Sequence, residues 1–199
     1  MFSFSVKSSS VLKATLFLFM VFFGGTNFCY GNDSIKELIH GRLSADKKTL
    51  DLSGGKIGPR GAKVLAGMSL LANVEMLLLQ GNKIKYAGIK NLAKSPHSTN
   101  LKHLDLWGNM IGDMGLKVLS ESNFIKGLEV LKLWKNEIGD DSLELMVKSS
   151  NFKHLKTLML NNNMVTPVGA GYLANPDVFP QLETLNLFRN SIGDEGALL

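Results

Sequence analysis

The sequence is almost free of cysteine, and this limits how the chain can be stabilised. Of its 199 residues only Cys29 is a cysteine, so no disulfide can form within the chain. The segment after residue 31 contains none and therefore has no cysteine nucleophile. The stability of that segment has to come from packing and hydrogen bonds.

Recognisable catalytic motifs are absent as well. The four histidines, His40, His97, His103 and His154, have no metal-ligand spacing among themselves. The chain carries no glycine-rich phosphate loop, no Gly-x-Ser-x-Gly elbow and no calcium loop. We therefore expect no catalytic residues, no metal and no cofactor, and we predict that the protein is not an enzyme.

A strong excess of one charge is also lacking. The formal net charge is +5, and Lys7 and Lys13 in the first 31 residues supply two of the positive charges. The remaining 20 basic and 17 acidic residues leave a surplus of only +3. This surplus is too small to argue for nucleic-acid binding, and no basic cluster with interleaved aromatic residues is seen.

The first 31 residues have the three-part pattern of a secretory signal peptide. A weakly basic stretch, 1–13, precedes an apolar run, 14–23, and small residues follow, with Gly31 suited to cleavage. The run is shorter than the roughly 20 apolar residues that a membrane span needs. We predict export to a periplasm, a cell surface or the medium. The alternative is an uncleaved anchor over 11–28, the only case in which membrane contact is expected.

An internal repeat of 27 residues organises the remaining chain. Six segments align without a gap, and each carries two leucines that are two residues apart. The first leucines of these pairs are Leu50, Leu77, Leu104, Leu131, Leu158 and Leu185. An asparagine follows in five repeats, at Asn82, Asn109, Asn136, Asn163 and Asn190. A β-branched residue comes two positions after this column in every repeat.

These spacings predict a strand, a turn and a helix in each repeat. Two leucines at a spacing of two lie on one face of a strand, and the apolar residues in 111–119 follow a helical period. We expect Asp113 or Asp140 to cap the start of its helix. One such unit cannot bury its own apolar face, whereas six stacked units can. The fold prediction is an α/β solenoid with a parallel sheet on the concave face and helices on the convex face.

The asparagine column is predicted to be structural. Each side-chain amide can satisfy backbone groups that the turn leaves unpaired in a site that water does not reach. We therefore assign these asparagines to the scaffold and expect no catalytic role for them.

The pattern LxxLxLxxNxI resembles the leucine-rich repeat. The helix starts, such as Gly61-Ala62 and Gly115-Leu116, resemble the ribonuclease-inhibitor-like branch of that family. The resemblance covers 47–199 and implies a segment of a horseshoe that binds another macromolecule. We divide the chain into a signal peptide (1–31), an N-terminal capping helix (32–46) whose start Ser34 caps, and six repeats (47–199), the last of them incomplete.

The concave face is where we predict a partner to bind. The column after the second leucine contains both tryptophans, on adjacent repeats, and parallel strands about 4.8 Å apart should bring their rings into contact. Exposed aromatic residues ringed by charge are typical of interface hot spots. The predicted partner-binding residues are His103, Asp105, Trp107, Lys132, Trp134, Lys135, Met159, Asn161, Phe188 and Arg189. The alternative interpretation is that the rings merely pack against each other.

A second pattern alternates in sign. Two residues before each first leucine the chain reads Lys48, Glu75, Lys102, Glu129, Lys156 and Glu183. We interpret it as a ladder that fixes the register of the repeats, with a recognition edge as the alternative.

The sequence therefore predicts an exported, non-catalytic module that binds a protein through its concave sheet. One alternative, by family analogy, is an activator or inhibitor of a partner enzyme such as a GTPase or a hydrolase. A second alternative is a truncated remnant of a longer repeat protein.

Overall fold

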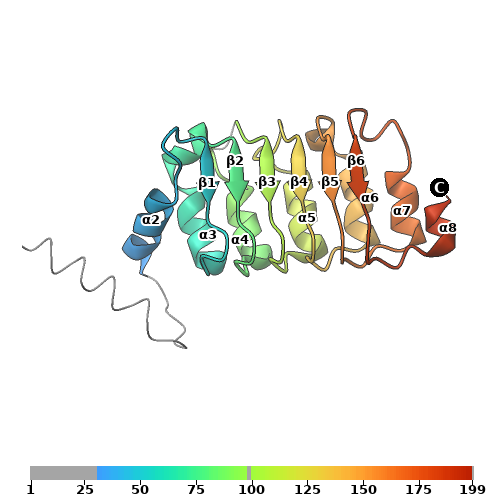
Figure 1. Ribbon diagram of the computed structural model, residues 1–199, viewed down its shortest axis with the longest axis horizontal. Helices are drawn as coiled ribbons and strands as arrows, with labels where there is room; N and C mark the ends of the chain where they lie inside the picture. Colours follow the sequence, from blue (N-terminus) through green and yellow to red (C-terminus); the bar gives the residue numbers. More distant parts are fainter. Residues whose placement is uncertain (1–30, 98–99, 199) are drawn as a thin grey trace, which may run out of the picture.

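The computed structural model describes residues 31–97 and 100–198 (Figure 1). The predicted signal sequence, apart from Gly31, lies outside the described residues. Six strands form one parallel sheet whose order follows the chain. They are β1 (Thr49–Asp51), β2 (Met76–Leu78), β3 (His103–Asp105), β4 (Val130–Lys132), β5 (Thr157–Met159) and β6 (Thr184–Asn186).

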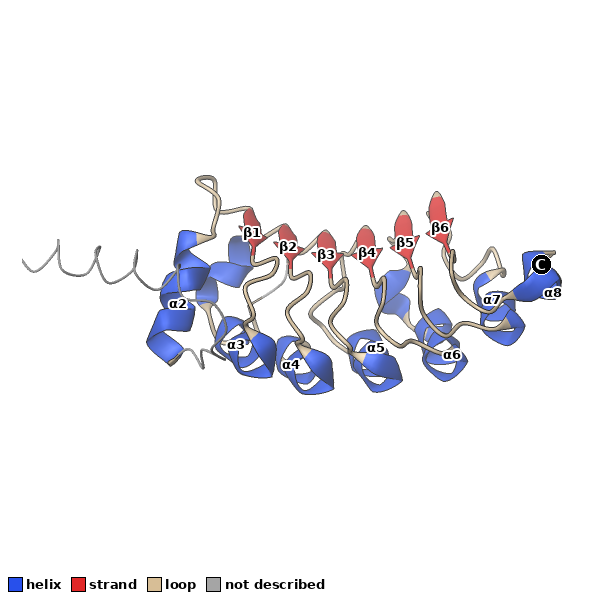
Figure 2. Ribbon diagram, turned by 60° about the horizontal axis from the view of Figure 1, so that its bottom comes forward, coloured by secondary structure: helices blue, strands red, loops and turns tan. Residues whose placement is uncertain are grey.

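A helix follows each strand and returns the chain to the start of the next one. These helices are α3 (Gly58–Ala66), α4 (Lys85–Leu92), α5 (Gly112–Ser120), α6 (Asp140–Lys148), α7 (Pro167–Leu173) and α8 (Gly193–Ala197). Two short 3-10 helices, η1 (Ser69–Asn73) and η2 (Ser150–Phe152), lie in the connections. Figure 2 shows the strands lining the hollow side of a curved wall and the helices covering its outer side. The predicted α/β leucine-repeat solenoid is thereby confirmed.

The 27-residue period sets the register of the sheet. Leu50 pairs with Leu77, Leu77 with Leu104, and the same step continues to Leu185. Leu50 to Leu158 in this column are buried between the sheet and the helices, as are the second leucines from Leu52 to Leu160. Every leucine therefore packs against its own equivalents in the neighbouring repeats, which is why six copies form a core that one copy cannot form.

The first repeat is covered by helix α2 (Asn32–Gly41). Ile35 and Ile39 lie four residues apart on one face of this helix and are fully buried in the common core. The expectation that Ser34 caps the helix is wrong, because the helix begins before it, at Asn32. The Ser34 hydroxyl instead donates to the carbonyl oxygen of Gly31.

The prediction that Asp113 and Asp140 cap their own helices is also wrong. The Asp113 carboxylate accepts hydrogen bonds from the Gly139 amide at 2.7 Å and from the Ser142 hydroxyl at 2.6 Å. Asp140 accepts from the Thr166 amide at 3.0 Å. Each aspartate therefore binds the helix start of the next repeat, because stacking places the next turn closer to the carboxylate than the amides of its own helix.

The last repeat is more open than the others. The Leu185 side chain is 38% exposed, whereas its equivalents in the preceding repeats are buried. Among the described residues, no helix is long and apolar enough to cross a membrane.

Candidate functional site

The asparagine column forms a continuous ladder through the turns. The Asn136 side-chain amide donates to the carbonyl oxygens of Leu106 and Trp134, and its side-chain oxygen accepts from the backbone amides of Asn109 and Ile111. Asn82, Asn109, Asn163 and Asn190 repeat these side-chain bonds to carbonyl groups. Each asparagine thus joins its own turn to the turn before it, and the ladder holds the ends of the strands in place.

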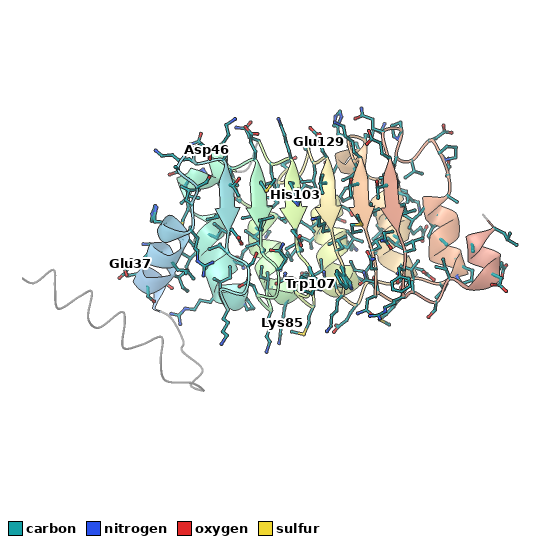
Figure 3. The ribbon with its side chains drawn as sticks, in the orientation of Figure 1. Glu37, Asp46, Lys85, His103, Trp107 and Glu129 are labelled. Atoms are coloured by element: carbon teal, nitrogen blue, oxygen red, sulfur yellow. The ribbon has the colours of Figure 1, made fainter. Side chains whose placement is uncertain are left out.

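Beyond this ladder the concave face carries a stacked pair of tryptophans. The centroids of the Trp107 and Trp134 rings are 5.0 Å apart, and the ring planes are inclined by 19°. The parallel hydrogen bonding continues past the strands, since the Gly108 amide donates to the Trp134 carbonyl oxygen at 2.9 Å. The rings remain 43% and 39% exposed, so stacking does not remove them from water. Figure 3 shows Trp107 near the edge of the sheet at which the strands lead into the turns.

A chain of polar groups leads across the sheet to this pair. The Ser53 hydroxyl donates to Gln80, whose side-chain amide donates to Asp105 at 2.8 Å. Asp105 also accepts the Trp107 backbone amide at 3.0 Å, and the Lys132 ammonium lies 3.7 Å from it. The Asp105 side chain is thereby fixed, and it in turn fixes the backbone that carries Trp107.

The placement of Asp105 changes its expected role. We predicted that it contacts a partner, but the residue is only 4% exposed and its carboxylate is already bonded on several sides. These partners replace the water that burial removes from the carboxylate. Asp105 therefore positions Trp107 and Lys132 and does not itself face a partner.

His103 begins the same strand and is half-buried between its neighbours Met76 and Val130. Its Nε2 atom is buried and has no hydrogen-bond partner within the described residues. Burial, and then the positive charge of Lys132, lower the pKa of His103 below its ordinary value. The neutral imidazole is therefore the form that the folded protein favours.

This environment predicts a pH-dependent stability. Because the pKa of His103 is lowered in the folded protein, the unfolded chain binds a proton at this residue more readily. The contribution of the neutral His103 to stability is therefore full above the unfolded pKa of about 6.5 and is lost as the pH falls below that value. We expect H103L to reduce the fall in melting temperature between about pH 7.5 and about pH 5. Thermal unfolding measures this, with H154L at an exposed position as the matched control. An unchanged pH dependence in H103L would contradict the assignment.

The C-terminal repeats extend the aromatic surface. The Phe188 ring is 67% exposed, and the Arg189 guanidinium lies over it, 5.4 Å from the ring centroid. Met159 and Asn161 are half-buried on the neighbouring repeat, between the tryptophan pair and Phe188 in repeat order. We call Trp107, Trp134, Asn161 and Phe188 the aromatic strip.

Two cations beside the strip have an unusual backbone conformation. Lys135 and Arg189 have φ angles of 56° and 59°, in the left-handed region. The equivalent residues of the first three repeats are Gly54, Gly81 and Gly108, which also have positive φ. A side chain in this region costs on the order of 1 kcal/mol relative to glycine. The fold does not need these two side chains, so their presence points to a role at the surface.

Four exposed apolar residues that we did not predict lie near the strip. They are Met110, Met114, Met164 and Val168. All four belong to the turns and helix starts of repeats three and five. The signal in the sequence was their place in columns that hold charged residues in other repeats: Met110 and Met164 align with Lys56 and Glu137. They add exposed apolar side chains in the turns and helix starts that follow the sheet.

Two hollows in the described residues lie away from the strip. One is lined by Glu75, Asn100, Leu101, Lys102 and Gly127, and the other by Ala93, Lys94, Ser95, Pro96, Glu121, Ser122 and Asn123. No group of three or more histidine, cysteine or acidic side chains placed to hold a metal is found in this part of the chain. The aromatic strip is an open face, a shape that suits a macromolecule better than a small ligand.

The alternating charges lie at the opposite edge of the sheet, where Figure 3 places Glu129. Lys48 pairs with Glu75 at 2.8 Å, Lys102 with Glu75 at 3.9 Å, and Lys156 with Glu129 at 2.8 Å. The hydrogen bonds from Lys48 and Lys156 lower the pKa of Glu75 and of Glu129. These charges satisfy one another, which fits a ladder that holds register better than a recognition edge.

Comparison with known proteins supports the reading of the repeats. A family model of the leucine-rich repeat matches residues 48–66, 97–120 and 180–199. The fold is a leucine-rich-repeat solenoid. The three matches fall in the first, third and last repeats, and the register of the sheet extends the same unit to the other three. A search among curated proteins returns no match.

Leucine-rich repeats generally mediate contacts between proteins, and the family is typically not enzymatic. A non-catalytic binding module fits both this family and the open face of the present solenoid. In such repeats the scaffold is shared and the exposed positions differ, so specificity has to be sought in the side chains that the scaffold leaves in water.

Proposed function

We propose that this protein is an exported interaction module that binds a protein partner through the aromatic strip on its concave face. The observation that carries the proposal is the stacked Trp107–Trp134 pair, which is well packed and yet about 40% exposed. Covering an exposed aromatic side chain with a partner is favourable by roughly 25 cal/mol for each Å² of apolar surface removed from water. Tryptophan is also the residue type most enriched in interface hot spots.

The surroundings of the pair match the anatomy of a protein interface. Lys135 and Arg189 supply a charged rim, while Met159 and Phe188 extend the apolar centre. The hydrogen bonds of Asp105 hold Trp107 in place before any partner arrives, which lowers the entropic cost of binding. Because the aromatic strip has apolar area with few charges at its centre, a protein surface suits it better than a nucleic acid does.

The rim cations give a test that leaves the fold intact. We expect K135G/R189G to retain or slightly raise the melting temperature, because glycine adopts the observed φ angles without strain. The same change should weaken partner capture at least about tenfold, since it removes two charges beside the strip. The measurement is capture by immobilised full-length protein from an extract of the source cells, followed by titration of the captured partner.

The matched control is K126Q/K153Q, which removes two positive charges from exposed positions away from the strip. Capture should be the same with this variant as with the native chain. Equal capture by K135G/R189G and the native chain would place the binding surface elsewhere, on the convex helices.

We further propose that the chain is exported and that residues 1–31 direct this. The support is the basic, apolar and small-residue pattern of the sequence. The alternative is retention in a membrane by residues 11–28. Cell fractionation with N-terminal sequencing distinguishes them, because cleavage after Gly31 yields a chain that begins at Asn32. Kinship with the ribonuclease-inhibitor-like branch is part of the same proposal and rests on the Gly-Ala and Gly-Leu helix starts.

A further inference from the structure

Charge is distributed unevenly along the solenoid. Between Asp51 and Asp105 the chain contains eight basic residues and a single acidic one, Glu75. The basic residues are Lys56, Arg60, Lys63, Lys83, Lys85, Lys90, Lys94 and Lys102. After Asp105, acidic residues outnumber basic ones by 11 to 8. The small net charge of the whole chain thus conceals a strongly basic first third of the solenoid and a mildly acidic remainder.

Stacking gathers these cations into two rows. Lys56 and Lys83 are one period apart in the turns, beside Lys85 at the start of α4; we call these three the turn row. Lys63 and Lys90 are likewise one period apart, in the last turns of the packed helices α3 and α4; we call these two the helix row. All five side chains are exposed. Figure 3 shows Lys85 at the turn edge of the molecule, pointing away from the sheet.

The two rows differ from the charge ladder at the opposite edge. There the sign alternates and ion pairs form, such as Lys48 with Glu75. In the turn row and the helix row the same sign recurs in neighbouring repeats, and within residues 31–97 and 100–198 these five lysines form no ion pair. Like charges brought together by stacking repel each other, so the rows cost stability unless an anionic partner compensates them.

Lys85 shows that the fold itself does not call for this charge. Its φ angle is 57°, and the equivalent positions in the first, third and sixth repeats are Gly58, Gly112 and Gly193, which share the left-handed conformation. A lysine therefore occupies a site at which glycine is the unstrained choice. The extra cation lies beside Lys56 and Lys83, where it adds to the turn row.

We propose that the turn row and the helix row together form a surface that docks this protein on an anionic lipid bilayer. The proposal is independent of the aromatic strip, which lies on the concave face of repeats three to six. All five cations of the two rows are lysines. Lysine is a mobile point charge that suits a diffuse anionic surface, whereas bidentate recognition of one phosphate favours arginine.

The features of other anionic partners are missing from the same surface. Binding of single-stranded nucleic acid uses exposed aromatic rings for stacking, and the one aromatic residue between Asp51 and Asp105 is Tyr86, which is half-buried with the Lys90 ammonium 5.8 Å from its ring centroid. The two hollows described above have different linings and offer no groove for an acidic peptide on the rows.

Lysine footprinting on the full-length chain tests the proposal. Amines are acetylated in the presence of vesicles of phosphatidylcholine alone, or of phosphatidylcholine with about 30% phosphatidylserine, and each site is quantified by mass spectrometry. We expect the acetylation rates of the turn row and the helix row to fall at least about fivefold with anionic vesicles, and this protection to disappear at about 1 M salt. Lys126 and Lys153, exposed in later repeats, serve as internal controls and should change less than twofold. The comparison holds even if the apolar run inserts into both kinds of vesicle.

A variant adds a second readout. Near an anionic membrane each lysine raises the partition coefficient about fivefold. K83Q/K85G should therefore need about 25-fold more anionic lipid to reach half of the protection of Lys56, Lys63 and Lys90. W107A/W134A should leave the protection unchanged, which separates this surface from the proposed partner site. Equal acetylation with both vesicle types would overturn the proposal. Protection by an acidic protein or an RNA homopolymer, with none by anionic vesicles, would also overturn it.

Discussion

Replacing both tryptophans of the aromatic strip, W107A/W134A, should weaken partner binding at least about a hundredfold. Each ring offers a large apolar surface at the centre of the strip, and the loss of one such hot spot typically costs about 2 kcal/mol or more. The fold should tolerate the change, because the rings are 43% and 39% exposed and contribute little to the leucine core. Binding of the captured partner by titration calorimetry, with melting temperature measured alongside, checks both halves of the expectation.

The single variants sharpen this test. W107A and W134A each leave one ring without its stacking partner at 5.0 Å. The loss of binding free energy in the double variant should therefore exceed the loss in either single variant but be smaller than the sum of the two single losses. F188A, at the 67% exposed end of the strip, provides a graded comparison. Unfolding of the double variant, or binding as tight as that of the native chain, would show that the two rings belong to the scaffold.

Replacing one rung of the asparagine ladder should have the largest effect on stability. N136A removes a buried side chain that donates to two carbonyl oxygens and accepts from two backbone amides. The Leu106 carbonyl oxygen keeps the Asn109 side-chain amide as a donor, and the Trp134 carbonyl oxygen keeps the Gly108 amide. The backbone amides of Asn109 and Ile111 are therefore the groups that lose their acceptor. Buried groups without a partner cost about 1–3 kcal/mol each, so we expect a loss of at least about 2 kcal/mol. This is a large share of the 5–15 kcal/mol that stabilises a typical domain. Chemical denaturation followed by circular dichroism measures it.

Asn161 provides the matched control. It follows the buried Leu160 directly, is half-buried, and lies in the strip rather than in the ladder. N161A should therefore change the free energy of unfolding by less than about 1 kcal/mol. If N136A is no more destabilising than N161A, the ladder does not hold the turns together.

Much of the fold followed from the sequence because its signal is repeated. A leucine pair at a spacing of two is weak as a single strand signal, but six copies at a constant 27-residue step leave one register for the sheet. The same step accounts for the stacking of Trp107 on Trp134, since residues one period apart must lie side by side in a parallel ladder.

The exceptions concern side chains that interact across repeats. Asp113 was expected to cap its own helix, yet its carboxylate binds Gly139 and Ser142 of the next repeat. Asp105 was expected to contact a partner, yet it is buried, accepts a hydrogen bond from Gln80 and pairs with Lys132. Periodicity gives the face on which a side chain starts, but not the neighbour it reaches, which depends on the distance between successive turns.

Side chains that the scaffold does not require could be recognised only from the backbone angles of the structure. Lys135, Arg189 and Lys85 have left-handed backbone angles at positions where the equivalent residue of several other repeats is glycine. A side chain that the scaffold tolerates at a cost is a better pointer to function than one that the scaffold requires.

By itself the sequence determined the repeating unit, the order and register of the strands, and the side of the sheet on which the leucines are buried, because these depend on periodicity and burial alone. The tertiary structure decided which polar groups satisfy one another across repeats and which side chains remain in water without a partner. The physical reason is that hydrogen bonds and ion pairs act over about 3–4 Å, and the period of a sequence does not specify distances that short.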